Sequence, residues 1–253
     1  SCRDGRCPVH TQRVKRKLKY TANRKPPTSA EPHLGVEIEC FAPSETVHRA
    51  MCAQNRTPCE DGSLPNMGCE FKFCFTVPKA LRDIPKFARR LEEVGAAVNS
   101  RCGLHVHIDA RGVLSTRREA FIVWLSTWQD WWFSIMPASR QSNPYTCPIP
   151  CHSRYGWASK TSYGTIEIRI HGGTISPHKL TGWLSVCADL GDLLRSAEEF
   201  PTVLLVDGKP TDESLRRIFK RPEGYNYLKA REAGNGSLVS YSVTSGGVRE
   251  EVA

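Results

Sequence analysis

Residues 164–174 read GTIEIRIHGGT, an alternating run that ends in a pair of glycines. Three isoleucines alternate with Glu167, Arg169 and His171. Because successive side chains of a β-strand point to opposite faces, this alternation predicts a strand with one apolar and one ionisable face. We expect Glu167, Arg169 and His171 to point the same way.

The same alternation recurs in three earlier segments, which are HLGVEIECFAP (33–43), MGCEFKFCFTVP (67–78) and CGLHVHIDARG (102–112). Apolar residues at helical spacing lie between and after the strands. We expect helices over 78–98, from an N-cap at Ser115 to about Ile135, after Ser176-Pro177 and near 212–220. Residues 137–163 are rich in Pro, Ser, Asn and Cys and are expected to form a long loop. Helices that can cover the apolar strand faces predict an α+β sandwich.

The ionisable faces of these strands hold a particular set of residue types. They carry four glutamates and the two histidines of one HVH stretch, which are residue types that bind divalent metals. Four clustered carboxylates would repel one another without cations, so we favour a metal-binding face over a solvated one. The predicted metal ligands are Glu37, Glu39, Glu70, His105, His107 and Glu167.

Glutamate-dominated ligation favours Mg²⁺ or Mn²⁺ over Zn²⁺, and Mg²⁺ held by carboxylates commonly bridges to nucleotide phosphates. Arg169 on the same face would neutralise phosphate charge as it develops. The sequence contains no GxxxxGK[ST] loop and no GxGxxG after a strand. A nucleotide site would therefore be of another type.

The chain has 253 residues, 40% of them apolar, a net charge of +9 and eleven cysteines. No run approaches the roughly 18 apolar residues of a membrane span, and no signal peptide is evident. We therefore expect a cytoplasmic protein without membrane contact and with thiols that are reduced or bind metal. A basic, Pro-containing arm (1–32) precedes the main domain (33–233), and a Gly/Ser-rich tail (234–253) follows it.

The ordered set GVEIE (35–39), EDGS (60–63), GCEFKF (68–73), CGLHVHID (102–109) and TIEIRIHGGT (165–174) resembles the amidoligase family, many of whose members are encoded in phages and bacteria. That family belongs, with glutamate–cysteine ligase, to the glutamine synthetase-like carboxylate–amine ligases. The resemblance covers roughly residues 33–200. It implies an open antiparallel sheet with helices on its outer face, like the glutamine synthetase catalytic domain. It also implies ATP with two or three Mg²⁺ or Mn²⁺ ions on the other, concave face, and amide formation through an acyl phosphate.

The resemblance also implies roles for single residues. Glu37, Glu39, Glu70 and Glu167 match the metal glutamates, and His105 or His107 matches the metal histidine. Arg169 matches the arginine that holds the transferring phosphate, so Arg169, Glu37 and His105 are the predicted catalytic residues. Nucleotide contacts are expected from Arg169, Arg154 and Lys72, and substrate contacts from Asp61, Ser63 and His171. The substrates would be an amino-acid or peptide carboxylate and an amine.

Two other functions compete with the ligase. The HVH stretch would also suit a metal-dependent hydrolase. Alternatively, CRDGRCPVH (2–10) and CPIPCH (147–152) would hold a structural Zn²⁺ in a binding protein. Whichever function holds, the basic arm, with VKRKLKY at 14–20, would suit contact with nucleic acid or another polyanion, although a solvated tail is the simpler interpretation.

Overall fold

The computed structural model describes residues 31–54, 64, 67–141, 143–151 and 155–234. The chain divides into two units, residues 1–31 and 32–253, and every element described below lies in the second. The basic arm lies outside the described residues, except for its last two positions, and so does the tail after its first residue. Within the described part, no helix combines the length and apolar character that crossing a membrane requires.

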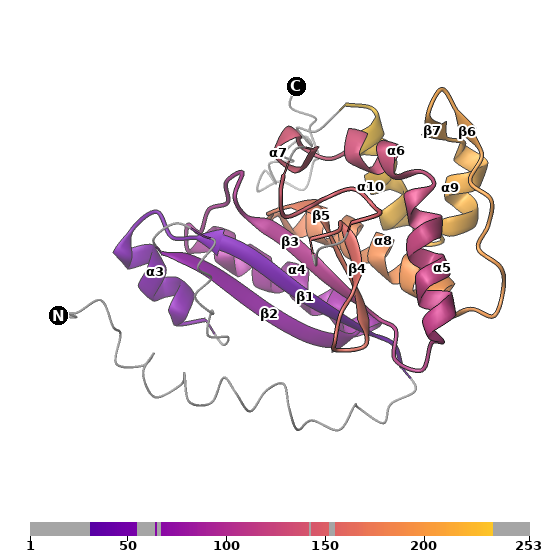
Figure 1. The fold of residues 1–253 in the computed structure, drawn as a ribbon. Coiled ribbons are helices and arrows are strands. Elements are labelled where there is room, and N and C mark those ends of the chain that lie inside the picture. Colours follow the sequence, from indigo (N-terminus) through magenta and orange to yellow (C-terminus); the bar gives the residue numbers. More distant parts are fainter. Residues whose placement is uncertain (1–30, 55–63, 65–66, 142, 152–154, 235–253) are drawn as a thin grey trace. The chain divides into compact units, whose positions relative to one another are not determined.

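The centre of the second unit is a five-stranded sheet with the strand order β2-β1-β3-β5-β4. Its strands are β1 (His33–Phe41), β2 (Gly68–Thr76), β3 (Gly103–Asp109), β4 (Ala158–Lys160) and β5 (Thr165–Gly172). All neighbouring strands run antiparallel, and the sheet is open, with β2 and β4 at its edges. The predicted antiparallel α+β architecture is therefore confirmed (Figure 1).

Eight helices accompany the sheet in the part of the chain that the structure describes. The helices are α3 (Glu45–Cys52), α4 (Val77–Glu93), α5 (Ser115–Ser126), α6 (Gln129–Ser134), α7 (Ala138–Gln141), α8 (Pro177–Arg195), α9 (Asp212–Ile218) and α10 (Pro222–Glu232). A short hairpin of β6 (Leu205–Val206) and β7 (Lys209–Pro210) precedes α9. Helices α4 and α8 contact each other and the sheet, and they lie behind it in Figure 1.

The apolar core forms between the sheet and these helices. Ile166, Ile168 and Ile170 are fully buried, as the alternation in the sequence predicts. Phe71 and Phe73 of β2 pack edge-on against Phe87 of α4, with ring centroids 5.0 and 5.1 Å apart. The apolar side of each strand thus faces the helices, and the ionisable side chains lie on the opposite face of the sheet.

Three expectations about secondary structure need correction. The segment 137–163 is not wholly loop, since it contains α7 and the edge strand β4, whose three residues are too few to show a pattern. The helix predicted from 115 to 135 is interrupted at Thr127 and Trp128, where several tryptophan rings pack together. Its N-cap position is Leu114 rather than Ser115, whose hydroxyl donates to Glu119 instead. Helix α10 was not predicted at all.

Candidate functional site

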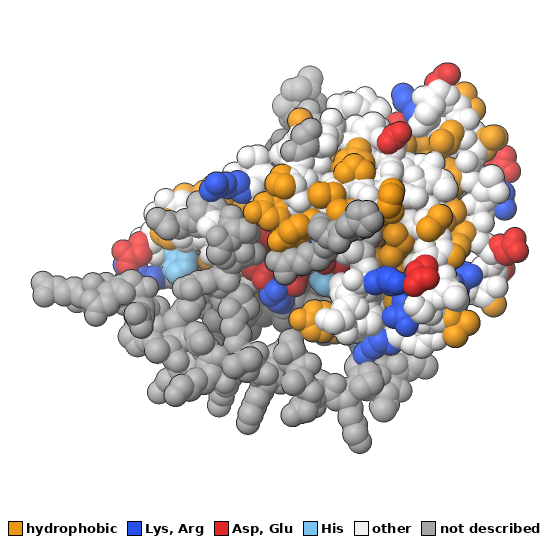
Figure 2. Space-filling view, viewed as in Figure 1, with side chains coloured by type: hydrophobic (Ala, Val, Ile, Leu, Met, Phe, Trp, Pro, Cys, Tyr) orange, Lys and Arg blue, Asp and Glu red, His pale blue; other side chains and the backbone are white. Residues whose placement is uncertain are grey.

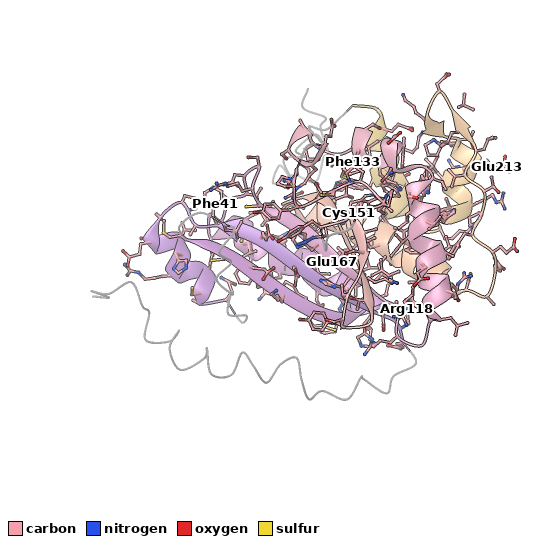
Figure 3. The ribbon with its side chains drawn as sticks, viewed as in Figure 1. Phe41, Arg118, Phe133, Cys151, Glu167 and Glu213 are labelled. Carbon is pink, nitrogen blue, oxygen red and sulfur yellow. The ribbon has the colours of Figure 1, made fainter. Side chains whose placement is uncertain are left out.

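The ionisable side chains of four strands meet on the face of the sheet opposite the helices. Glu37, on β1, lies directly opposite Lys72 of β2 and His105 of β3 in the strand register. His107 lies opposite Glu167 of β5. Glu167 is labelled near the middle of the sheet in Figure 3, and Figure 2 shows acidic, basic and histidine side chains together near the centre of the same view.

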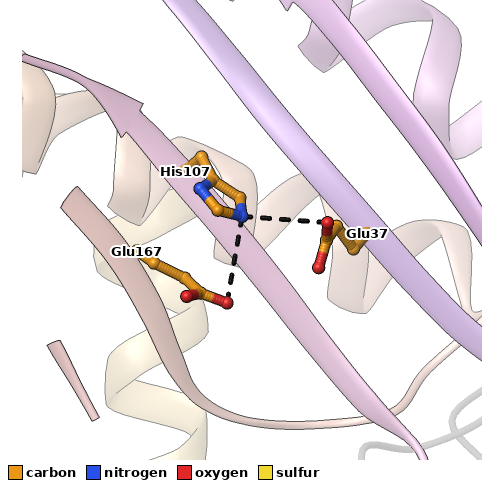
Figure 4. Close-up of side chains that lie close together, drawn as sticks. All are labelled: Glu37, His107 and Glu167. Carbon is orange, nitrogen blue, oxygen red and sulfur yellow. Dashed lines mark ion pairs between the residues drawn. The ribbon is translucent and has the colours of Figure 1, made fainter. Parts of the chain in front are cut away.

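Glu37, His107 and Glu167 form a group that we call the β5 triad (Figure 4). Their ligand atoms all lie within 4.8 Å of one another. Nε2 of His107 lies between the two carboxylates, 3.9 Å from Oε1 of Glu37 and 3.8 Å from Oε1 of Glu167. On the other side of the ring, Nδ1 is 3.0 Å from the hydroxyl oxygen of Thr165. That contact fixes the ring so that Nε2 faces the carboxylates.

Glu37, Glu70 and His105 form a second group, the β2 triad, whose ligand atoms also lie within 4.8 Å of one another. Nδ1 of His105 is 3.3 Å from Oε2 of Glu37. Glu37 therefore belongs to both triads. The ammonium group of Lys72 lies in the β2 triad, 2.9 Å from Oε1 of Glu37 and 2.7 Å from Oε2 of Glu70.

The charges in the cluster alter one another's protonation. Burial disfavours the carboxylate of Glu37, but the hydrogen bond with His105 and the charge of Lys72 outweigh it and hold the pKa of Glu37 well below its usual range. Burial likewise opposes the charge on Lys72, but Glu37 and Glu70 raise its pKa above the usual value. Burial lowers the pKa of His107 despite its carboxylate neighbours, so the ring is neutral at pH 7, the form that binds metals.

Glu39 belongs to neither triad. Its carboxylate accepts a hydrogen bond of 2.6 Å from the backbone N–H of Gly103, and it lies directly opposite Glu70 in the register. Nε2 of His105 is 3.7 Å from Oε1 of Glu39. The predicted metal role of Glu39 therefore stays a prediction, while its position supports the backbone at the start of β3.

Arg140 is a residue of this region that the sequence did not indicate. It is 2% exposed, it donates to the carbonyl oxygen of Cys102, and its Nε makes no hydrogen bond within the described residues. Burial lowers the pKa of the Arg140 guanidinium, and the nearby charge of Glu39 acts in the opposite direction. Only the fold brings the four-residue helix α7, which holds Arg140, to the sheet, so no local pattern would have revealed it.

Arg169 lies beside the β5 triad, as its place in the β5 alternation predicts. Its Nε is 3.4 Å from Oε1 of Glu167, and its guanidinium lies 5.7 Å from the ring centre of Tyr155. The Nε atom is buried and makes no hydrogen bond in the part of the chain that the structure describes. A buried guanidinium with a donor to spare is well suited to bind an anion.

His171 does not share the polar face, so this prediction is wrong. The β3–β5 register shifts by one residue between Val106↔Ile168 and Leu104↔His171, which turns His171 to the helix-covered side. Its ring packs against Trp183 and Tyr227 from α8 and α10, and it is 3% exposed. It lies in the core, away from the triads, and the predicted substrate contact has no support there.

Three predicted site residues, Asp61, Ser63 and Arg154, lie outside the described residues. The same holds for four of the proposed zinc ligands, namely Cys2, Cys7, His10 and His152. Cys147 and Cys151 are described and are both half-buried. The structure therefore gives no geometry for the predicted zinc site.

The two triads suit a divalent cation by their chemistry. Two ligands of one octahedral Mg²⁺ or Mn²⁺ lie roughly 3 to 4 Å apart, because each metal–oxygen bond is about 2.1 Å. The contacts of His105 and His107 with Glu37 and Glu167, at 3.3 to 3.9 Å, fall in this range. The donor set of carboxylates with one imidazole each fits Mn²⁺ as well as Mg²⁺.

No family model matches the sequence, and no curated protein matches it either, so the amidoligase resemblance stays a prediction. Among solved structures, apo GmaS without ligand is similar, with a TM-score of 0.47 and 14% sequence identity over 85% of this chain and 70% of that chain. A GmaS/ADP complex has a TM-score of 0.41 and 14% identity over 80% of this chain and 67% of that chain. A likeness at this identity concerns the backbone alone, so function is argued below from the side chains.

Proposed function

We propose that the chain is an ATP-dependent carboxylate–amine ligase, which forms an amide bond through an acyl-phosphate intermediate. The observation that carries the proposal is the sharing of Glu37 by two potential metal-ligand triads, with the buried Arg169 beside one of them. Carboxylates that hold divalent cations next to a buried guanidinium suit a polyphosphate substrate. Many enzyme classes use a polyphosphate substrate. Among them, we favour a ligase because motifs that resemble the amidoligase family occur in the same order along the chain.

The chemistry needs negative groups to approach each other. A substrate carboxylate oxygen attacks the γ-phosphorus of ATP, the bond to the β–γ bridging oxygen breaks, and ADP leaves. The amine nitrogen then attacks the acyl carbon, the bond to the phosphate oxygen breaks, and the nitrogen loses a proton as the amide forms. Mg²⁺ or Mn²⁺, held by Glu37, His107 and Glu167, would screen the repulsion in the first step.

The chain's own residues would have separate tasks. Arg169 would donate to the transferring phosphoryl group, where negative charge spreads over its oxygens. His105 would hold Glu37 in place through the contact of 3.3 Å between them. Glu37, whose pKa is lowered by its partners, would stay ionised at neutral pH and serve both triads.

The test is a screen of carboxylate and amine pairs for ADP release in the presence of Mg²⁺ or Mn²⁺. ADP release should require both substrates. With an ¹⁸O-labelled carboxylate, one labelled oxygen should appear in the released phosphate, because that oxygen bridges the acyl carbon and phosphorus in the intermediate. Unlabelled phosphate from a productive pair would contradict the acyl-phosphate route.

A metal-dependent hydrolase is the second candidate, and one observation favours it. His105 and His107 both lie within 4 Å of the same two carboxylates, Glu37 and Glu167. A single metal with two imidazoles and carboxylates is a common hydrolytic centre. Amide hydrolysis by the purified protein without any nucleotide would favour this candidate over the ligase.

A further inference from the structure

The two triads differ in one respect, which is the cation that already lies in one of them. Nζ of Lys72 bridges Glu37 and Glu70 of the β2 triad at 2.9 and 2.7 Å. In the β5 triad, Lys72 contacts only the shared Glu37, and Arg169 contacts only Glu167, at 3.4 Å and without a hydrogen bond from its Nε among the described residues. Among the described side chains, Lys72 thus joins two of the three members of the β2 triad, and no cationic side chain joins two members of the β5 triad.

From this difference we propose that Lys72 is a built-in cation that takes the place of a second metal ion, so that the site binds one divalent cation, at the β5 triad. The inference rests on the metal binding of the proposed function and specifies its stoichiometry. It differs from the two or three ions that the family resemblance implies.

The position of Lys72 follows from the backbone. Lys72 lies directly opposite Glu37 in the β1–β2 register, and Glu70 lies two residues before it on the same face of β2. The side chain of Lys72 therefore starts next to both of the residues whose carboxylates its ammonium group joins. A lysine at this register position can reach both acids without leaving the sheet face.

Charge and space both argue against a second divalent ion beside Lys72. A metal bound about 2.1 Å from the oxygens of Glu37 and Glu70 would lie within a few ångströms of Nζ, where two cations repel strongly. Lys72 would have to leave both of its partners first.

The charge count of the cluster points the same way. Glu37, Glu39, Glu70 and Glu167 contribute four negative charges, and Lys72, Arg140 and Arg169 contribute three positive ones. One divalent ion would neutralise the remaining negative charge and leave one net positive charge. That charge would attract an anionic substrate. A second ion would leave a large excess of positive charge on a half-buried surface.

The experiment is a titration of the whole 253-residue chain with Mn²⁺, without nucleotide, because ATP carries a metal ion of its own. Isothermal titration calorimetry counts the ions, and electron paramagnetic resonance reports whether two Mn²⁺ ions lie close enough to couple. We expect one ion per wild-type chain, with the spectrum of isolated Mn²⁺. The variant Lys72→Met should bind two ions with a coupled spectrum, and its tighter site should gain about tenfold in affinity as Glu37 is released.

Two further variants make the test specific. Lys160→Met is the matched control, since Lys160 also lies on a strand of the sheet and pairs with one acid, Glu119, at 2.7 Å. It should bind Mn²⁺ as the wild type does. If Lys72→Met does not fold, Lys72→Gln, which keeps a polar end group, replaces it.

The outcomes separate this inference from the function it rests on. Two ions in the wild type, or one ion in Lys72→Met and Lys72→Gln, would overturn the role of Lys72 and leave the metal centre intact. No Mn²⁺ binding by the wild type would overturn the proposed metal centre itself, and the inference with it.

Discussion

Gly35 of β1 lies directly opposite His107 of β3, and a Cβ atom added at Gly35 would lie 3.0 Å from the Cβ atom of His107. The glycine leaves the space in which the His107 ring turns toward Glu37 and Glu167. This one missing side chain therefore helps to form the β5 triad.

The variant Gly35→Ala should displace His107 by a few tenths of an ångström. We expect Mn²⁺ affinity to fall about tenfold, as for losses of support around a metal ligand, and the free energy of unfolding to fall by about 1 kcal/mol. Gly156→Ala is the control, because its added Cβ would meet only ordinary contacts at 3.5 Å. Unchanged Mn²⁺ binding by Gly35→Ala would show that the ring position does not depend on this glycine.

The variant Glu37→Gln should affect both triads at once. Its amide keeps the shape of the side chain but loses the charge, so we expect Mn²⁺ affinity to fall about 100-fold or more and ADP release to be abolished. Calorimetry and the ligase assay check the two effects. Glu119→Gln, at an exposed position of α5, should leave both unchanged. Full activity in Glu37→Gln would refute the metal assignment.

Arg169→Lys should separate phosphate binding from metal binding. Lysine keeps the charge but loses the planar array of donors, so we expect kcat of ADP release to fall about 10²- to 10³-fold. Mn²⁺ binding without nucleotide should stay within about threefold of the wild type, because Arg169 contacts a ligand rather than the ion. A parallel loss of Mn²⁺ affinity and kcat would instead mean that Arg169 only supports Glu167.

His171 should make the stability of the fold depend on pH. Its Nδ1 donates to the carbonyl oxygen of Gly172, and its Nε2 accepts from the hydroxyl of Tyr227, both at 2.5 Å, so the ring is held neutral. Burial and the charges of Arg231, Arg140 and Lys179 lower its pKa well below the usual value. Protons thus bind the unfolded chain before they bind the folded one as the pH falls.

The free energy of unfolding should therefore be highest above pH ~6.5, the usual pKa of histidine, and fall by about 1.4 kcal/mol for each pH unit below it. Denaturant unfolding between pH 5 and 8 measures this slope. His107, whose pKa is also lowered, adds to it in the same direction. In the variant His171→Gln, the slope of the free energy of unfolding against pH should lose the contribution of His171. The variant His178→Gln, at an exposed position, should keep the full slope. An unchanged slope in His171→Gln would contradict the assignment.

The sequence was sufficient to predict the strands and the face on which most ionisable residues lie, because alternation is a local property of each strand. Glu37, Glu70, His105, His107, Glu167 and Arg169 lie on the face that the alternation predicts. Their partners were not predictable, since these depend on the register between strands far apart in the chain. The division into two triads that share Glu37 follows only from that register.

The remaining differences also have long-range causes. His171 follows the alternation of β5, but a shift in its pairing with β3 reverses its direction. Arg140 comes from the short helix α7, whose four residues show no pattern, and reaches the site through the fold. In both cases the neighbours of the side chain come from segments that are distant in sequence. The periodicity of one segment gives no information about such contacts.

The place of Glu37 on β1, between the two triads, also bears on how the protein can change over evolutionary time. A substitution at His105 or Glu70 alters the environment of a carboxylate that His107 and Glu167 also use. Effects on the two sides should thus be non-additive, since residues that share a partner are coupled. A replacement that is harmless in one sequence background would be harmful in another. The five residues of the two triads would therefore change together in evolution, and Glu37 would vary least.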